Sequence, residues 1–100
     1  MLIIEQTEEF KAWAKGLKDK NALKLVLNKT KHVALGNFGD SKAVDGAKGI
    51  HELRIHYGAG YCIYLTKIDN KIVFLLCGGI KRTQDKDIEQ AKKLLKNLEV

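Results

Sequence analysis

The spacing of hydrophobic residues changes near the middle of the chain. In the first half, apolar side chains recur at intervals of three and four residues, as with Phe10, Trp13 and Leu17, which is typical of amphipathic helices. From residue 50 onwards, apolar and polar residues alternate over three consecutive segments, which is typical of β-strands. The last segment, residues 83–98, returns to a helical spacing. The pattern therefore predicts helices first, then a run of strands, then one more helix.

Helix caps and glycine-containing turns divide the chain into elements. Thr7 and Asp19 are side chains that cap helix N-termini, and Gly16 ends the first helix early. Thr83 is a similar cap before the last helix. Strands are predicted at residues 2–6, 42–44, 50–57, 61–68 and 71–78. The fold class is therefore α+β, a single domain over residues 1–100 in the order β-α-α-β-β-β-β-α. An N-terminal strand and helical hairpin precede an antiparallel meander and a C-terminal helix, with the helices largely on one face of the sheet.

Turns at residues 58–60 and 69–70 predict how the three long strands pair. They place Tyr57 opposite Tyr61 and Leu65 opposite Phe74. Alternation along the strands then separates a core face from an open face. The predicted core face consists of Leu53, Ile55, Tyr57, Tyr61, Ile63, Leu65, Ile72, Phe74 and Leu76. The predicted open face consists of Glu52, Arg54, His56, Cys62, Tyr64, Thr66, Val73, Leu75 and Cys77.

The open face carries the side chains that are best suited to binding an anion or transferring a proton. Arg54 and His56 share one strand, and Lys81 and Arg82 follow directly after the last strand. Guanidinium groups bind phosphate oxygens through several hydrogen bonds, and imidazole exchanges protons near neutral pH. We expect these four residues to surround one concave surface as candidate catalytic groups. The alternative is an ordinary solvated face on which Arg54 pairs with Glu52 or with a helix acid.

Three further residues are candidates for contact with nucleic acid. Tyr64 offers a ring for base stacking and a hydroxyl group for a hydrogen bond. Lys42 and Lys48 flank the turn at residues 46–49, from which they could reach an RNA backbone, although solvated lysines are the default interpretation.

Composition limits the classes of function. The 100 residues suffice for one core and exclude a Rossmann or barrel enzyme with separate domains. Lys and Arg number 18 against 12 Asp and Glu, giving a formal charge of +6 that suits a polyanion such as RNA or DNA. No apolar run is long enough to span a membrane, and the acidic start does not fit a signal peptide. We expect a cytoplasmic protein with no membrane partner.

The two cysteines leave several interpretations open. In the predicted register Cys62 and Cys77 lie opposite each other, which would allow a disulfide. Zinc is disfavoured because there is no C-x-x-C spacing and because His51 and His56 point to opposite faces. A reactive thiol at Cys62 would require Arg54 to lower its pKa.

Four short stretches together resemble the HigB-like addiction module killer proteins of the RelE/ParE toxin superfamily. They are GDSK at 39–42, ELRI at 52–55, GAGY at 58–61 and LLCGGIK at 75–81. Tyr64, Gln84, Asp87, Ile88 and Ala91 continue the match. The resemblance covers nearly the whole chain, and the ordered set of motifs is specific.

The resemblance implies a compact toxin of a type II toxin–antitoxin pair. Related toxins cleave messenger RNA, often in the ribosomal A site, without a metal or another cofactor. The ribose 2′-hydroxyl attacks the adjacent phosphate while cationic side chains stabilise the developing charge. The implied partners are messenger RNA, the ribosome and a small antitoxin with a helix-turn-helix domain. The ParE branch shares the fold but acts on gyrase, and it remains the alternative.

The resemblance also assigns residue roles. Arg54 and His56 occupy strand positions where related toxins carry basic catalytic residues, and Lys81 and Arg82 follow the last core strand as their basic residues do. The family favours Gly-Pro-Gly-Tyr-Arg at the hairpin, whereas this chain has Ala59 for the proline and Cys62 for the arginine. The missing arginine leaves a third interpretation open, a weakened toxin that only binds RNA or its antitoxin.

Overall fold

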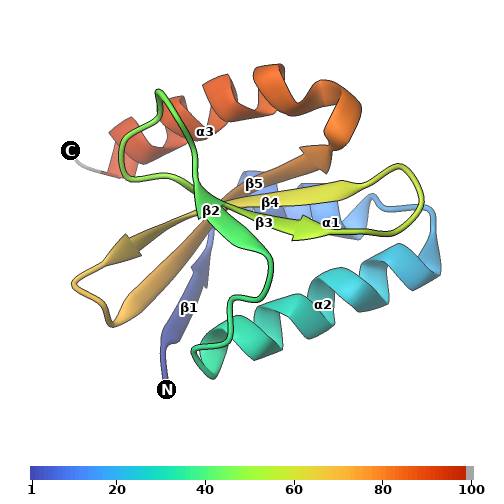
Figure 1. Cartoon of the computed structure of the whole chain (residues 1–100), viewed down its shortest axis with the longest axis horizontal. Helices are drawn as coiled ribbons and strands as arrows, with labels where there is room; N and C mark the ends of the chain where they lie inside the picture. The colour runs from blue at the N-terminus through green and yellow to red at the C-terminus, as the bar shows by residue number, and fades with distance from the viewer. Residues whose placement is uncertain (99–100) are drawn as a thin grey trace.

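The computed structural model describes residues 1–98, which form a five-stranded sheet and three α-helices (Figure 1). The elements are β1 (Ile3–Gln6), α1 (Glu8–Lys15), α2 (Lys20–Ala34), β2 (Ser41–Ala43), β3 (His51–Ile55), β4 (Tyr61–Ile68), β5 (Ile72–Ile80), the 3-10 turn η1 (Lys81–Thr83) and α3 (Gln84–Leu98). This order confirms the predicted α+β class. None of the helices within residues 1–98 has the length and apolar character needed to cross a membrane.

Two of the predicted helix caps are formed. The hydroxyl oxygen of Thr7 accepts a hydrogen bond from the backbone N–H of Phe10 at 3.0 Å, and the Asp19 carboxylate accepts one from Asn21 at 2.9 Å. Thr83 has a different position, at the end of η1, where its hydroxyl group donates to the carboxylate of Asp87 at 2.5 Å. It therefore ties the first turn of α3 to the 3-10 turn that precedes it.

The strands lie in the order β1-β5-β4-β3-β2, with β1 parallel to β5 and the other pairs antiparallel. Ile55 pairs with Tyr61, so the register between β3 and β4 differs by two residues from the predicted one. A shift of two residues preserves the faces of both strands. Because β3 ends at Ile55, His56 lies just beyond the strand, in the connection to β4, rather than on it.

A β-bulge makes the pairing of β4 with β5 differ from the predicted register. Tyr64 pairs with Cys77 and Leu65 pairs with Leu75, so Leu76 is an extra residue in β5. The predicted opposition of Cys62 and Cys77 is therefore wrong.

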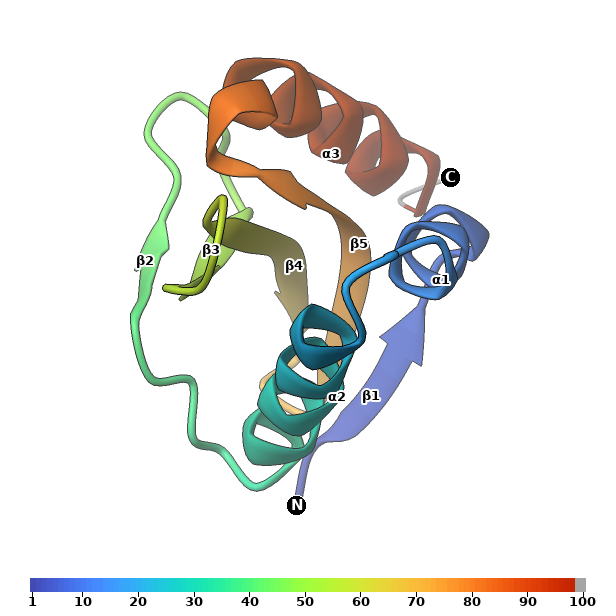
Figure 2. The ribbon, with the colours of Figure 1, turned by 90° about the vertical axis from the view of Figure 1, so that its right-hand side faces the viewer.

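Helices pack against both faces of the sheet (Figure 2), so the prediction of helices largely on one face is wrong. Between the sheet and α1 and α2 lie Phe10, Ala14, Val26, Val33, Leu53, Ile55, Ile63, Leu65, Val73 and Leu75. Between the sheet and α3 lie Ala47, Ile50, Cys62, Tyr64, Leu76, Cys77 and Ala91, with Phe74 partly buried among them. Phe74 and Leu76 therefore face α3, contrary to prediction. Of the face predicted to be open, Cys62, Tyr64 and Cys77 are covered by α3, whereas Val73 and Leu75 lie on the opposite face, in the core with α1 and α2.

Candidate active site

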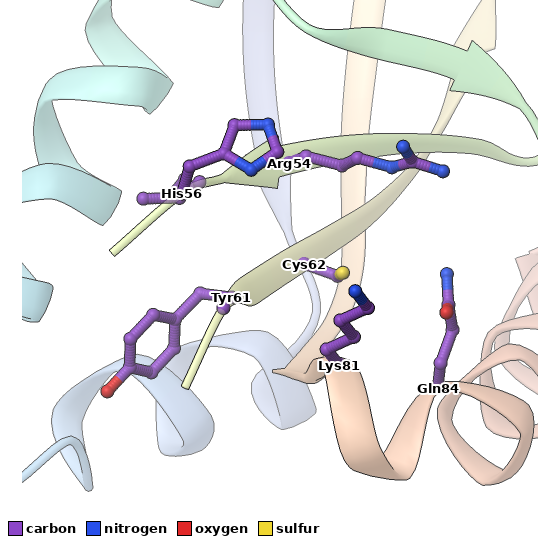
Figure 3. A pocket seen from close by; sticks show the side chains of 8 residues that line it. Arg54, His56, Tyr61, Cys62, Lys81 and Gln84 are labelled. Carbon is purple, nitrogen blue, oxygen red and sulfur yellow. The ribbon is translucent and has the colours of Figure 1, made fainter. Parts of the chain in front are cut away.

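A cavity of about 270 Å³ opens where the ends of β3 and β4 meet η1 and the start of α3 (Figure 3). Its lining residues are Arg54, Ile55, His56, Gly60, Tyr61, Cys62, Lys81 and Gln84. The backbone N–H of Lys81 donates to the carbonyl oxygen of Gly60 at 2.9 Å, which fixes η1 against the connection between β3 and β4. The fold therefore brings three of the four predicted catalytic residues, Arg54, His56 and Lys81, to one cavity.

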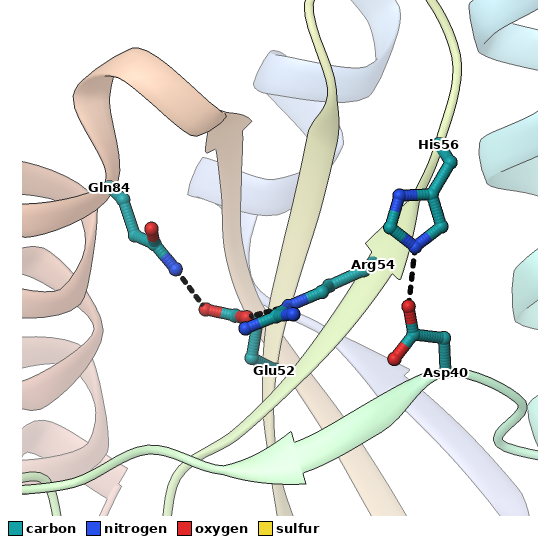
Figure 4. A network of polar contacts seen from close by, with 5 residues as sticks. All are labelled: Asp40, Glu52, Arg54, His56 and Gln84. Carbon is teal, nitrogen blue, oxygen red and sulfur yellow. Dashed lines mark hydrogen bonds and ion pairs between the residues drawn. The ribbon is translucent and has the colours of Figure 1, made fainter.

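Arg54 is held by a buried carboxylate (Figure 4). Its Nε donates to Oε1 of Glu52 at 2.6 Å, and the amide of Gln84 donates to the other oxygen, Oε2. Glu52 is only 1% exposed, whereas the side chain of Arg54 is 37% exposed. The hydrogen bond to Glu52 raises the pKa of Arg54, so the guanidinium stays charged. The pairing with Glu52 is thus formed, and Arg54 still reaches the cavity.

His56 is paired with an acid from a distant loop. Its Nε2 lies 2.5 Å from Oδ2 of Asp40, the residue directly before β2 (Figure 4). The pair is accessible, since the side chains of His56 and Asp40 are 73% and 50% exposed. The hydrogen bond to His56 lowers the pKa of Asp40, with further contributions from the charges of His56, Arg54 and Lys29. Asp40 is therefore a carboxylate at neutral pH.

The two cations after β5 differ in position. Lys81 is exposed and lines the cavity, and within residues 1–98 it forms no ion pair. Arg82, the next residue, is exposed in η1 but does not line the cavity. Lys81 is therefore the cation available to an anion in the cavity, while the geometry gives Arg82 a peripheral place.

The residues predicted to contact RNA lie elsewhere. Lys42 is exposed on β2, and Lys48 lines a separate hollow beside α3 together with Lys92 and Lys96. Tyr64 is fully buried beneath α3, which closes its ring off from a base and corrects the expectation that its face is open. Burial raises the pKa of Tyr64, and its hydroxyl has no hydrogen-bond partner within residues 1–98.

The groups that hold the cations in place are not among the predicted site residues. Asp40 and Gln84 stand out in the sequence only through the family motifs, and Glu52 is one of the alternative partners for Arg54. A signal for Glu52 exists in the sequence, since an acid and a base two residues apart share one face of a strand. Asp40 and His56 are 16 residues apart, and only the pairing of β2 with β3 brings them together.

The two cysteines are separate, unbonded thiols. Both are buried, and Cys62 pairs with Gly79 rather than with Cys77. Burial and the nearby charge of Glu52 raise the pKa of Cys62, and the opposing effect of Arg54 is smaller, so a lowered pKa is not found. Burial raises the pKa of Cys77 to about 12.

We expect both thiols to be unreactive in the folded protein at neutral pH, because the thiolate is the reactive form and burial disfavours it. Titration with a chromogenic disulfide reagent should detect no fast-reacting thiol before denaturant is added and two afterwards. Immediate reaction of Cys62 in the native protein would contradict this expectation.

No group of three or more His, Cys, Asp or Glu side chains within residues 1–98 is placed to hold a metal ion. The chemistry that this cavity can provide is that of cations, an imidazole and an amide. Such groups bind an anionic centre, stabilise charge that develops on it and transfer protons.

Comparison with known proteins connects this geometry to a fold. The chain is 46% identical over 95 residues to an uncharacterized protein of Haemophilus influenzae, and the match covers 95% of this chain and 94% of that protein. No family model matches the sequence.

Three similar solved structures are of the RelE toxin, alone or with its antitoxin. A double arginine mutant of Escherichia coli RelE in the free state has a TM-score of 0.70 at 14% identity, over 91% of this chain and 93% of that chain. Isolated E. coli RelE gives 0.60 at 14% identity over 90% and 98% of the two chains, and a chain of the intact RelBE toxin–antitoxin complex gives 0.54 at 14% over 80% and 96%. The chain therefore has the RelE fold.

Proposed function

We propose that this chain, which belongs to one family with the uncharacterized Haemophilus influenzae protein, is the toxin of a type II toxin–antitoxin pair and cleaves messenger RNA. The observation that carries the proposal is the cavity that collects Arg54, His56 and Lys81 on a RelE fold. The four motifs favour the HigB-like branch. The proposed partners are a helix-turn-helix antitoxin, messenger RNA and the ribosome, in the cytoplasm.

The proposed reaction is a metal-free transesterification within the RNA. The 2′-hydroxyl oxygen bonds to the adjacent phosphorus as its proton passes to a base, for which His56 is the candidate. The bond from phosphorus to the 5′-oxygen then breaks, and that oxygen takes up a proton from water, to which the protonated His56 returns one. Lys81 and the outer nitrogens of Arg54 stabilise the negative charge on the phosphate oxygens.

Induced expression tests this function. We expect growth arrest, with message ends mapping to cleavage within translated regions, and relief of the arrest when the antitoxin is co-expressed. Lys81→Ala should lose the arrest, because it removes the unpaired cation of the cavity. Lys86→Ala is the matched control, since Lys86 is an exposed lysine five residues along the chain that does not line the cavity. DNA damage signalling without message cleavage would point to a gyrase-directed toxin instead.

The ends of the RNA products provide an independent check. Attack by the 2′-hydroxyl must leave a 2′,3′-cyclic phosphate on one fragment and a free 5′-hydroxyl on the other. The downstream fragments should therefore accept a labelled phosphate from polynucleotide kinase without prior phosphatase treatment. Products with 5′-phosphate ends would contradict the mechanism, because they require water rather than the ribose as the nucleophile.

A weakened toxin is the second candidate, favoured by the cavity position of Cys62 in place of the family arginine. Under this proposal the wild-type chain binds RNA or the antitoxin with little cleavage. Cys62→Arg should then create growth arrest, whereas an active wild-type protein would already cause it.

A further inference from the structure

We infer that Asp40 is a positioning residue that determines which nitrogen of His56 is free to accept a proton, so that the two act as a carboxylate–imidazole pair at the mouth of the cavity. The inference rests on the proposed function for its catalytic meaning. It assigns a role to a loop acid for which composition and spacing gave none.

The side chains of Asp40 and His56 are in direct contact. Oδ2 of Asp40 lies 2.5 Å from Nε2 of His56 (Figure 4). An ionised carboxylate only accepts hydrogen bonds, whereas neutral imidazole carries its single proton on one nitrogen and a lone pair on the other. In the neutral form of His56 the proton therefore sits on Nε2, and Nδ1 carries the lone pair.

The free nitrogen belongs to a side chain that lines the cavity. Figure 4 shows the second ring nitrogen of His56 on the side of the ring away from Asp40. A lone pair at that place can take the proton of a bound 2′-hydroxyl group. The positive charge that His56 then acquires is stabilised by the carboxylate of Asp40.

Asp40 itself is held by the backbone. Its carbonyl oxygen accepts a hydrogen bond at 2.9 Å from the backbone N–H of Arg54, two residues before His56. The next residue, Ser41, begins β2 and pairs with Leu53 of β3. Asp40 and His56 therefore lie just outside two strands that pair with each other, and the backbone hydrogen bond to Arg54 holds the acid beside the histidine.

The charges around the pair keep Asp40 ionised. The hydrogen bond to His56 lowers the pKa of Asp40, and the charges of Arg54 from β3 and Lys29 from α2 lower it further. Lys81 from η1 adds a cation to the cavity that His56 also lines. The pair contributes little to folding, because both side chains are largely exposed to water. A loss of activity on changing Asp40 is therefore distinguishable from a loss of structure.

Asp40→Asn tests the inference. The asparagine amide can donate to Nε2, which moves the imidazole proton to Nδ1 and removes the lone pair from the cavity. We expect kcat for RNA cleavage to fall by about 100-fold with little change in KM. Asp45→Asn is the matched control, since Asp45 is an exposed acid in the turn that follows β2, outside the cavity. It should behave as the wild type does.

Two readouts separate a positioning role from a structural one. Because Asp40 acts through His56, the double variant Asp40→Asn/His56→Gln should cleave no more slowly than His56→Gln alone. Nitrogen-15 NMR of the imidazole should show the proton of His56 on Nε2 in the wild type and on Nδ1 in Asp40→Asn. Additive losses in the double variant, or a neutral imidazole whose proton is on Nδ1 in the wild type, would overturn the inference. If the wild type cleaves no RNA, the proposed function fails, and the NMR result still decides the position of the proton.

Discussion

Arg54→Ala is expected to abolish growth arrest and to slow RNA cleavage by about 100- to 1000-fold, the usual cost of removing one donor that stabilises developing negative charge. The substitution has a second effect in this cavity. It leaves the carboxylate of Glu52, which is 1% exposed, with Gln84 as its remaining partner. A negative charge without its cation then adjoins the place where the phosphate should bind, and repulsion adds to the loss.

Two companion variants separate these effects. Arg54→Lys keeps a positive charge. A single ammonium group cannot donate to Glu52 and at the same time offer a planar pair of nitrogens to a phosphate, so we expect partial activity. Arg54→Ala/Glu52→Gln removes the unpaired charge, and any activity regained over Arg54→Ala measures the repulsion. Cleavage should be followed in single-turnover assays on variants whose circular dichroism and thermal unfolding match the wild type. Wild-type rates for Arg54→Ala would remove this residue from the reaction.

The features that the sequence predicted correctly are set by neighbouring residues. The caps at Thr7 and Asp19 satisfy backbone donors a few positions away, so they are readable without knowledge of the rest of the fold. The strand at residues 61–68 was predicted with the bounds that the structure shows. Local signals of this kind suffice for the order of the elements and hence for the fold class.

The features that were predicted wrongly depend on pairing between strands. The residues from Ile72 to Leu76 are all apolar, so alternation cannot show which side chains face which helix. The bulge at Leu76 then reverses the faces on either side of it, and no residue type marks its position. The same apolar run explains why α3 covers the second face of the sheet. A strand that is apolar on both faces requires helices on both.

The candidate site was predictable as a set of cations but not as a set of pairs. Arg54, His56 and Lys81 stand out by residue type and by their places next to strand ends. Their partners come from a buried strand position and from a loop far along the chain, and an acid at such places has many other uses. Which carboxylate holds which cation is decided only when β2, β3 and α3 are assembled.

The largest change in stability is expected at Gly79. A methyl group at this position would lie 2.6 Å from the carboxyl carbon of Asp87. Asp87 belongs to α3, which packs against β5 at this point. Asp87 is buried and its carboxylate is held by the hydroxyl of Thr83, so it cannot move aside without breaking that bond. Overpacking of this kind costs about 1–3 kcal/mol of unfolding free energy. Because Lys81 and Gln84 lie on the segment that would be displaced, Gly79→Ala should also reduce cleavage.

Gly78→Ala is the informative comparison because it meets a different neighbour on the opposite face of β5. Its methyl group would lie 2.6 Å from Cδ2 of Trp13 on α1. Trp13 is only partly buried and borders an open groove between α1 and α3, so its ring can give way. We therefore expect a smaller loss of stability in urea unfolding, and no loss of cleavage, since α1 contributes no residue to the cavity.

Gly46→Asn should leave stability close to that of the wild type, because the site is open and asparagine tolerates its φ of 76°. Equal losses of stability and cleavage in Gly78→Ala and Gly79→Ala would mean that the packing of Asp87 against Gly79 is not what positions Lys81.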